Sequence, residues 1–546
     1  MTQYQKMKYT VAAFLLTSSL LSAQNFTKRD SLKGSNTEYR NFWDVKKYEI
    51  SVEPDFGSRS VSGSNRITFE ITRDVKNPVF QIDLQQPMNY QIIGSDKKLC
   101  TSRRDGDFIF IETNANYRKG DKHNFTIAFS GNPTVAKNAP WDGGWVFTTD
   151  EEGNPWMSVA QEGIGASVWL PTKDLWSDEP DDGMIMNIIT PPELVGVANG
   201  RLISETKKGN KNVFTWEVKN PINAYSIVPN VGKYVNFKDN YPGEKGNLDL
   251  SYWVLHYNLD KAKNQFQQVK PMLAAFEHWF GPYPFYKDSY KLIETPYLGM
   301  EHQSGVGYGN GFANGYLGRD LSGTGVGLNW DFIIVHESGH EWFANSITAA
   351  DKADMWIHEG FTNYSETLFV EEYMDKASAE KYIIGLRRNI QNDVPIIGPY
   401  GVAKSGSGDM YYKGANMIHT IRQIINDDQK FRQILRDMNR DFYHKIATSK
   451  EVENYLSNAA GADLSTIFDQ YLRTTMVPTL EYVQQNTVLK FRYTNSVKNL
   501  RLPLRINQGS ATIVPSSEWK QIELKSSQPV QFNSNYYVNY LLAENN

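Results

Sequence analysis

One segment near the middle of the chain decides how the rest is interpreted: Asp331-Phe-Ile-Ile-Val-His336-Glu337-Ser-Gly-His340-Glu341-Trp-Phe-Ala344. On a helix, residues four apart lie on the same face, so the imidazoles of His336 and His340 could bind one cation. Glu337 would then lie beside that cation without being a ligand. In the His-Glu-x-x-His pattern the cation is zinc, and the glutamate takes a proton from a water whose pKa falls to about 7. The spacing therefore predicts a hydrolytic zinc centre.

Length and composition bound the class of protein. The chain has 546 residues, too many for one ordinary core, so about two to four domains are expected. A net charge of -4, without a basic run, predicts no nucleic-acid partner. Cys100 is the only cysteine, so no intramolecular disulfide can form and stability must come from buried apolar surface.

The first 24 residues differ from the rest of the chain. Lys6 and Lys8 precede an apolar run over residues 11–21, which is followed by Ser22, Ala23 and Gln24. This pattern predicts a signal peptide over residues 1–24, and the run is too short to span a bilayer of about 30 Å. We therefore expect an exported protein, periplasmic or secreted, with no transmembrane anchor after signal removal.

The remaining chain reads as a multidomain α+β protein. Short alternating segments bounded by turn residues predict an N-terminal antiparallel β domain over residues 25–248. Helical spacing then predicts a thermolysin-like, mostly helical catalytic domain over residues 249–475. Alternation returns over residues 476–546, as in Thr487–Tyr493 and Ser534–Leu541, which predicts a small C-terminal β-sandwich-like domain.

A carboxylate completes the expected metal site. Glu359 follows His340 by 19 positions, inside Trp356-Ile-His-Glu-Gly-Phe-Thr-Asn-Tyr-Ser-Glu366. Two imidazoles and one carboxylate leave a fourth tetrahedral position open, which is the catalytic arrangement of zinc. Groups that fix the imidazole tautomers are also needed, and the candidates are Asn363, Glu366 and Glu341.

Several further segments carry a family resemblance. They are Gly299-Met-Glu-His302, Phe280-Gly-Pro-Tyr-Pro-Phe285, Tyr411-Tyr-Lys-Gly414, Trp169-Leu-Pro-Thr-Lys-Asp174 and Ala198-Asn-Gly-Arg-Leu202. With the histidine motif, they resemble the gluzincin M1 zinc aminopeptidases, the family of aminopeptidase N and leukotriene A4 hydrolase, in a bacterial exported form. The resemblance covers nearly the whole mature chain.

The resemblance implies an aminopeptidase that removes amino-terminal residues from peptides. His336, His340 and Glu359 would bind one Zn²⁺ per chain. Glu337 would be the general base, and Tyr411 would donate a hydrogen bond to the developing oxyanion. Tyr412 is a less suitable neighbour, because only Tyr411 fits the motif offset.

The resemblance also implies how the free amino terminus is bound. Glu301, with Gly299 and Met300, would form the exopeptidase motif, although His302 replaces the usual asparagine. A second amine contact would come from Gln161 or Glu162, whose spacing departs from the family pattern.

Two other functions stay open at this point: a thermolysin-like endopeptidase, and an inactive zincin that serves as a binding scaffold. The preferred amino-terminal side chain is not determined by the sequence. About 70 residues of β-like tail stand where many relatives have a long helical domain, so an open cleft or a homodimer is compatible with the sequence.

Overall fold

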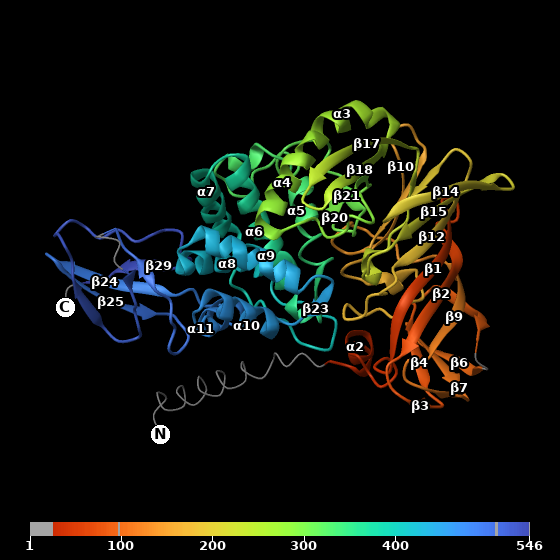
Figure 1. Ribbon diagram of the computed structural model, residues 1–546, viewed down its shortest axis with the longest axis horizontal. Coiled ribbons are helices and arrows are strands. Elements are labelled where there is room, and N and C mark those ends of the chain that lie inside the picture. Colours follow the sequence, from red (N-terminus) through yellow and green to blue (C-terminus); the bar gives the residue numbers. More distant parts are fainter. Residues whose placement is uncertain (1–25, 97–98, 508–511, 545–546) are drawn as a thin grey trace, which may run out of the picture.

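The computed structural model describes residues 26–96, 99–507 and 512–544, so the expected signal peptide lies outside the described residues. Figure 1 shows three regions in a row: a β-rich region at one end, a helical region in the middle and a small β region at the other end. This arrangement agrees with the fold class expected from the sequence. Among the described residues, none of the helices combines the length and apolarity needed to cross a membrane.

The β-rich region is built on a seven-stranded sheet in the order β14-β15-β12-β1-β2-β9-β5. Neighbouring strands are antiparallel except β1 and β12, which are parallel. Alternate residues of β9 are buried, so its apolar side chains face a core on one side of the sheet. The strands are β1 (Trp43–Asp55), β2 (Ser60–Ile71), β5 (Asn89–Ser95), β9 (Lys122–Gly131), β12 (Met184–Thr190), β14 (Arg201–Lys208) and β15 (Lys211–Val218).

Smaller sheets complete this region. One has the order β10-β11-β16-β13, another has the order β4-β7-β6, and β3 pairs with β8. The strands are β3 (Val75–Lys76), β4 (Val79–Asp83), β6 (Leu99–Asp105), β7 (Phe108–Thr113), β8 (Asn116–Tyr117), β10 (Gly144–Thr149), β11 (Pro155–Ala160), β13 (Val195–Val197) and β16 (Asn230–Gly232). A short helix, α2 (Lys28–Gly34), precedes them and lies where the β-rich and helical regions meet (Figure 1).

A five-stranded sheet joins the β-rich region to the helical region. Its order is β17-β18-β19-β21-β20, with bounds β17 (Tyr234–Gly243), β18 (Gly246–Leu255), β19 (Tyr290–Glu294), β20 (Gly299–Met300) and β21 (Val306–Tyr308). The expected domain boundary at residues 248/249 therefore falls inside β18. The hairpin of β17 and β18 alternates like the strands before it, and the sequence does not show that β18 pairs with β19, some 40 residues later.

The helical region is organised around α6 (Trp356–Tyr373), which is buried from Trp356 to Val370. A helix enclosed on all sides needs no polar face, and packing determines its stability. The other helices are α3 (Leu259–Gln265), α4 (Val269–Phe280), α5 (Phe332–Gly339), α7 (Lys376–Leu386), α8 (Tyr412–Ile425), α9 (Asp428–Asp441), α10 (Ser449–Ala460) and α11 (Ser465–Leu472). A two-stranded pair, β22 (Ile347–Ala349) with β23 (Lys445–Ala447), lies among them.

The C-terminal region is a four-stranded sheet in the order β28-β25-β24-β29, with a separate pair of β26 and β27. The bounds are β24 (Thr479–Gln485), β25 (Val488–Thr494), β26 (Leu504–Arg505), β27 (Thr512–Ile513), β28 (Lys520–Glu523) and β29 (Asn539–Leu542). Only the end of the expected strand Ser534–Leu541 is extended. Two residues before it instead contact α8: the Tyr537 N–H donates to Thr420 Oγ1, and Asn535 Oδ1 contacts His419 Nε2.

Candidate metal centre and active site

The motif helix α5 begins at a strong cap. Asp331 Oδ1 accepts hydrogen bonds from the N–H groups of Ile333 and Ile334, while its Oδ2 accepts from Tyr308 Oη at 2.7 Å. The helix ends at Gly339, so His340 is the C-cap, but its backbone keeps helical angles (φ -65, ψ -17). The spacing of the two histidines is therefore helical, and their ring centroids lie 5.0 Å apart.

Three side chains meet at one point. His336, His340 and Glu359 offer ligand atoms that all lie within 4.8 Å of one another. Glu359 Oε2 lies 3.6 Å from His336 Nε2 and 3.3 Å from His340 Nε2. This oxygen is buried and has no hydrogen-bond partner among the described residues. A buried orphan carboxylate oxygen that faces two imidazole nitrogens fits a zinc ion with one open position.

The other ring nitrogens are held by acceptors. His336 Nδ1 donates to Glu366 Oε1 at 2.7 Å, and His340 Nδ1 donates to the Phe343 carbonyl at 3.0 Å. Both Nε2 atoms are thus left for the metal. Asn363 Nδ2 donates to Glu366 Oε1 at 2.7 Å and so acts on the acceptor of His336. Glu341 accepts from the Ser304 N–H at 2.8 Å and serves a different part of the fold.

The charge state of Glu359 suits a ligand. Burial alone would raise the pKa of this carboxyl, but the neighbouring His340 and His336 outweigh burial and hold the pKa below its usual range. Glu359 is therefore ionised and ready to accept a cation.

Glu337 lies beside the metal ligands and lines the same cavity. Burial raises its pKa above the usual range of a carboxyl. The strand β20 passes very close: a Cβ on Gly299 would come within 2.9 Å of Glu337 Oε1 and 2.8 Å of Ile333 Cγ2. A glycine at position 299 is thus required by the close approach of β20 to α5.

Tyr411 stands immediately before α8 and reaches the metal ligands. Its Oη donates to Glu359 Oε1 at 2.9 Å, and its ring lies nearly parallel to His336 with centroids 6.0 Å apart. Tyr412 also lines the cavity. Tyr411 is therefore the tyrosine whose hydroxyl is in contact with a metal ligand.

Two carboxylates occupy another part of the cavity wall. Glu301 and Glu162 both line it, and each has a buried Oε1 without a hydrogen-bond partner among the described residues. Burial, followed by repulsion from Glu162, raises the pKa of Glu301 well above its usual range. Burial, followed by repulsion from Glu359, raises the pKa of Glu162 to about 8. A cation placed between these groups would favour the ionised form of both carboxyls and offset the effects of burial and repulsion.

The two candidates for the second amine contact separate clearly in space. Gln161 is buried, its Nε2 donates to the Tyr225 and Ile227 carbonyls, and its Oε1 accepts from Trp169 Nε1. Its polar atoms are used inside the β-rich region, and it does not line the cavity. Glu162, in contrast, lines the cavity.

The unusual His302 lies outside the cavity wall. Its side chain is buried, and burial lowers its pKa to about 3, so the ring is neutral. The backbone around it is held independently of the ring, since Asn345 Nδ2 donates to the Glu301 carbonyl at 2.7 Å. Met300 and Gly299, which precede Glu301, both line the cavity.

The cavity that contains these groups has a volume of about 670 Å³, which lies in the range of small-ligand sites. Sequence reasoning missed two charged residues of its wall, Lys404 and Lys352, of which Lys352 precedes α6. No motif marks Lys352, because its contacts are with a loop about 190 positions earlier in the chain.

Comparison with known proteins agrees with this architecture. The solved M1 zinc metallopeptidase from Deinococcus radiodurans has a TM-score of 0.68 and 18% identity, and the match covers 81% of this chain and 96% of that one. The β-rich region and the helical region with its His-His-Glu site thus form the fold of an M1 metallopeptidase. Residues 265–471 match the peptidase family M1 domain, so the chain carries a domain of this family.

Curated proteins also align with longer stretches of the chain. Probable aminopeptidase 2 of Sulfurisphaera tokodaii is 20% identical over 510 residues, which are 88% of this chain and 61% of the relative. Leukotriene A-4 hydrolase of Xenopus laevis is 21% identical over 449 residues, which are 76% of this chain and 68% of that protein. The chain spans about three fifths of the length of the first relative.

Proposed function

We propose that this chain is a zinc metallo-aminopeptidase that removes amino-terminal residues from peptides. One observation carries the proposal: Glu301 and Glu162 line the same cavity as the ligand set His336, His340 and Glu359, and each has a buried Oε1 without a hydrogen-bond partner among the described residues. The proposal uses one zinc ion per chain. A zinc ion in this site supplies Lewis acidity, which brings the ionisation of a water molecule close to neutral pH.

Glu337 acts as the proton carrier of the reaction. Its carboxylate takes a proton from the attacking water and later gives that proton to the leaving amine, so one group serves as base and then as acid. The position of Glu337 suits this shuttle, because it follows the ligand His336 directly and lines the same cavity.

Tyr411 acts on the substrate carbonyl. Negative charge develops on the carbonyl oxygen as the water attacks, and the phenol hydroxyl donates a hydrogen bond to it. The hydrogen bond from Tyr411 Oη to Glu359 supports this role, because it keeps the phenol beside a proposed metal ligand.

Glu301 and Glu162 bind the substrate ammonium. The pair discriminates against internal peptide segments, because an uncharged segment there would leave two buried carboxylates unpaired. A thermolysin-like endopeptidase has no use for such a pair. An inactive scaffold has no use for the intact set of Glu337, Tyr411 and three metal ligands.

The solved Deinococcus relative supports a peptide substrate by analogy, since one of its mutant structures is described as bound to a Tyr-Ser-Ala substrate. We also propose that the protein is exported, on the basis of the charged and apolar pattern in residues 1–24.

The decisive experiment is a panel of aminoacyl chromogenic amides, each with a free or an acetylated amino group, assayed with and without a chelator. We expect cleavage of the free-amine series, loss of activity with chelator and recovery with Zn²⁺. Cleavage of the acetylated series in preference to the free-amine series would overturn the proposal.

A further inference from the structure

We propose that Lys352 is a positioning residue for Glu162, which it holds in the substrate cavity from the segment that leads into the metal-binding helix. The inference rests on the proposed function, because it concerns the carboxylate that binds the substrate amine.

Two hydrogen bonds carry the inference. Lys352 Nζ donates to the backbone carbonyls of Glu162 and Gly163, each at 2.8 Å. Both carbonyls lie just after the Cα from which the Glu162 side chain enters the cavity. Glu162 Oε1 has no hydrogen-bond partner among the described residues, so the orientation of the carboxylate depends strongly on its backbone.

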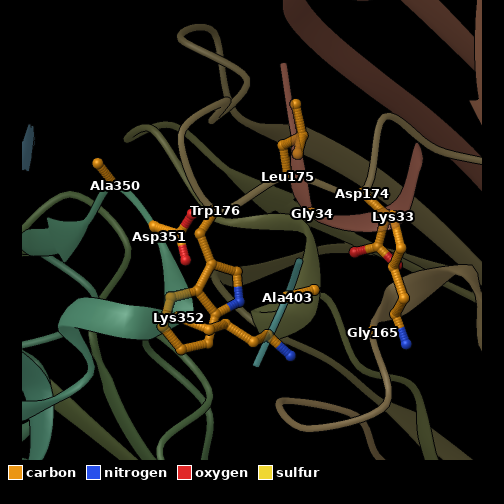
Figure 2. Close-up of a pocket in the computed structure, with 10 residues that line it drawn as sticks. All are labelled: Lys33, Gly34, Gly165, Asp174, Leu175, Trp176, Ala350, Asp351, Lys352 and Ala403. Atoms are coloured by element: carbon orange, nitrogen blue, oxygen red, sulfur yellow. The ribbon is translucent and has the colours of Figure 1, made fainter. Parts of the chain in front are cut away.

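The lysine itself is held in place. Its Nζ lies 5.2 Å from the centre of the Trp176 ring, a cation–π contact that Figure 2 shows beside Ala403. Lys352 begins the short helix η6 (Lys352–Asp354), which leads directly into α6 and Glu359. The ammonium thus connects the backbone of the amine-binding loop with the helix that carries a metal ligand.

The residue before Lys352 holds a second part of the cavity wall. Asp351 Oδ2 accepts from the Gly401 N–H at 2.7 Å, and its Oδ1 accepts from the Ala353 N–H at 2.9 Å. Residues 403–405 line the cavity shortly after Gly401. Two consecutive residues at the start of η6 therefore hold two separate loops around the metal site.

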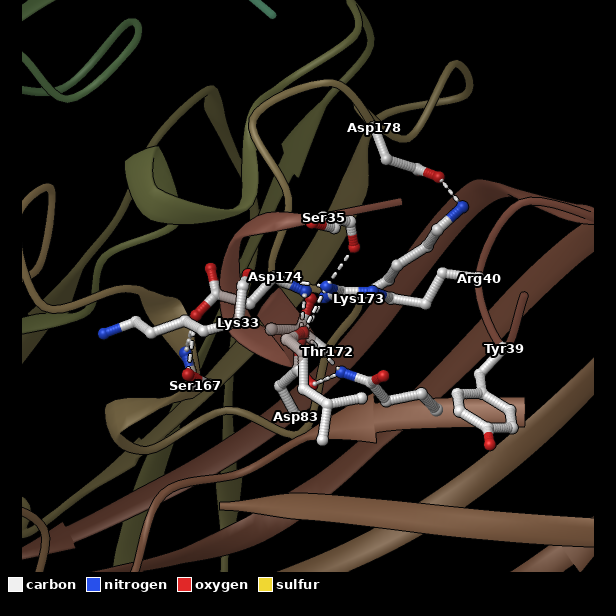
Figure 3. Close-up of polar contacts among 12 residues, drawn as sticks. Lys33, Ser35, Tyr39, Arg40, Asp83, Ser167, Thr172, Lys173, Asp174 and Asp178 are labelled. Atoms are coloured by element: carbon white, nitrogen blue, oxygen red, sulfur yellow. Dashed lines mark hydrogen bonds and ion pairs between the residues drawn. The ribbon is translucent and has the colours of Figure 1, made fainter. Parts of the chain in front are cut away.

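The far end of the Glu162 loop is fixed by the β-rich region. Gln85 Nε2 donates to the Ile164 carbonyl at 2.8 Å, and Ser167 Oγ donates to Asp174 Oδ2 at 2.6 Å. Figure 3 shows Asp174 beside Asp83, whose Oδ2 accepts from the Asp174 N–H at 3.2 Å and from Arg40 at 2.9 Å. With one end of the loop held there, the contacts of Lys352 determine where its cavity end lies.

The test compares the steady-state kinetics of the zinc-loaded wild-type protein and the zinc-loaded Lys352→Met variant on a free-amine chromogenic amide. Displacing a charged binding group by about 1 Å can cost up to about 100-fold, so we expect KM to rise about 10-fold or more while kcat stays within about threefold. Lys352→Arg, which keeps a charged donor, should have a KM close to that of the wild type. Lys381→Met, an exposed lysine on α7, is the matched control and should behave as wild type.

A double-mutant cycle separates positioning from a general loss of stability. If Lys352 acts through Glu162, Lys352→Met should add no further increase in KM to a Glu162→Ala protein. Lys352→Gln is measured in parallel, so that poor folding of the methionine variant does not decide the result. Unchanged KM in Lys352→Met and Lys352→Gln, or additive effects of Lys352→Met with Glu162→Ala, would overturn the inference. Failure of the wild type to cleave free-amine substrates would instead overturn the proposed function, and the inference with it.

Discussion

The hydroxyl of Tyr411 donates a 2.9 Å hydrogen bond to Glu359, the carboxylate whose other oxygen lies 3.3 Å from His340 Nε2. The phenol is therefore held at the candidate metal site by one of its proposed ligands. The position of this donor leads to the first prediction.

Tyr411→Phe should lower kcat by about 10²- to 10³-fold with KM nearly unchanged, because the lost donor acts on charge that develops only in the transition state. Kinetics and zinc content are measured together. Tyr412→Phe, which removes a hydroxyl from the adjacent residue, should have a much smaller effect on kcat. Equal losses in the two variants would contradict the role of Tyr411.

Glu337→Gln should keep zinc and lose turnover. The amide preserves the size of the side chain but cannot carry a proton, and general acid–base catalysis is worth about 10²- to 10⁴-fold. Metal analysis of the purified variant accompanies the assay. Near-normal hydrolysis by a zinc-loaded Glu337→Gln protein would show that another group moves the proton.

Glu301→Ala and Glu162→Ala should each raise KM for free-amine substrates and reduce the preference over acetylated ones, because each removes part of the ammonium site. Gln161→Ala should behave differently. Its buried amide is bonded to carbonyls of the β-rich region, so its loss should cost about 1–3 kcal/mol of stability. Thermal unfolding and KM measured on the three variants distinguish these outcomes, and a KM effect of Gln161→Ala without loss of stability would contradict the assignment.

A buried carboxyl away from the metal should make stability depend on pH. Burial raises the pKa of Glu179 to about 7, and its Oε1 accepts from Thr348 Oγ1 at 2.6 Å. The folded state therefore keeps the proton of Glu179 at pH values where the unfolded chain has lost it. Stability is fully present below about pH 4.5 and is lost as pH rises through about 7, with a total on the order of 3 kcal/mol.

Glu179→Gln, which cannot ionise, should remove this part of the pH dependence. The midpoint temperature of thermal unfolding is measured at about pH 5 and at about pH 8. The difference between these two midpoints should be smaller in the variant than in the wild type. An identical difference in both proteins would contradict the raised pKa.

The sequence predicts the metal ligands because their chemistry depends on spacing within single helices. His336 and His340 are four residues apart, and Glu359 lies in the first turn of α6. The choice between Gln161 and Glu162 could not be made in this way. Both are polar residues that follow a strand, and only the path of the loop after β11 directs one inward to hydrogen-bonded carbonyls and the other into the cavity.

The role of Lys352, and the sheet to which β17 and β18 belong, could not be predicted from the sequence. Both depend on contacts between segments that are far apart in the chain. A lysine before a helix looks like a solvated residue, and an alternating hairpin fits either neighbouring sheet. Periodicity describes the exposure of a strand and does not name its partner strand. Export and self-association stay predictions.

Glu366 accepts three hydrogen bonds, from His336 Nδ1, Asn363 Nδ2 and Tyr382 Oη. Both of its oxygens are therefore committed, and this second carboxylate close to the metal ligands cannot join them. The site offers a cation two nitrogens and one carboxylate. Calcium and magnesium require six or more ligands, nearly all oxygen, whereas zinc is satisfied by four that include imidazole. By occupying Glu366, Asn363 and Tyr382 thus contribute to the selectivity of the site for zinc over the abundant hard cations.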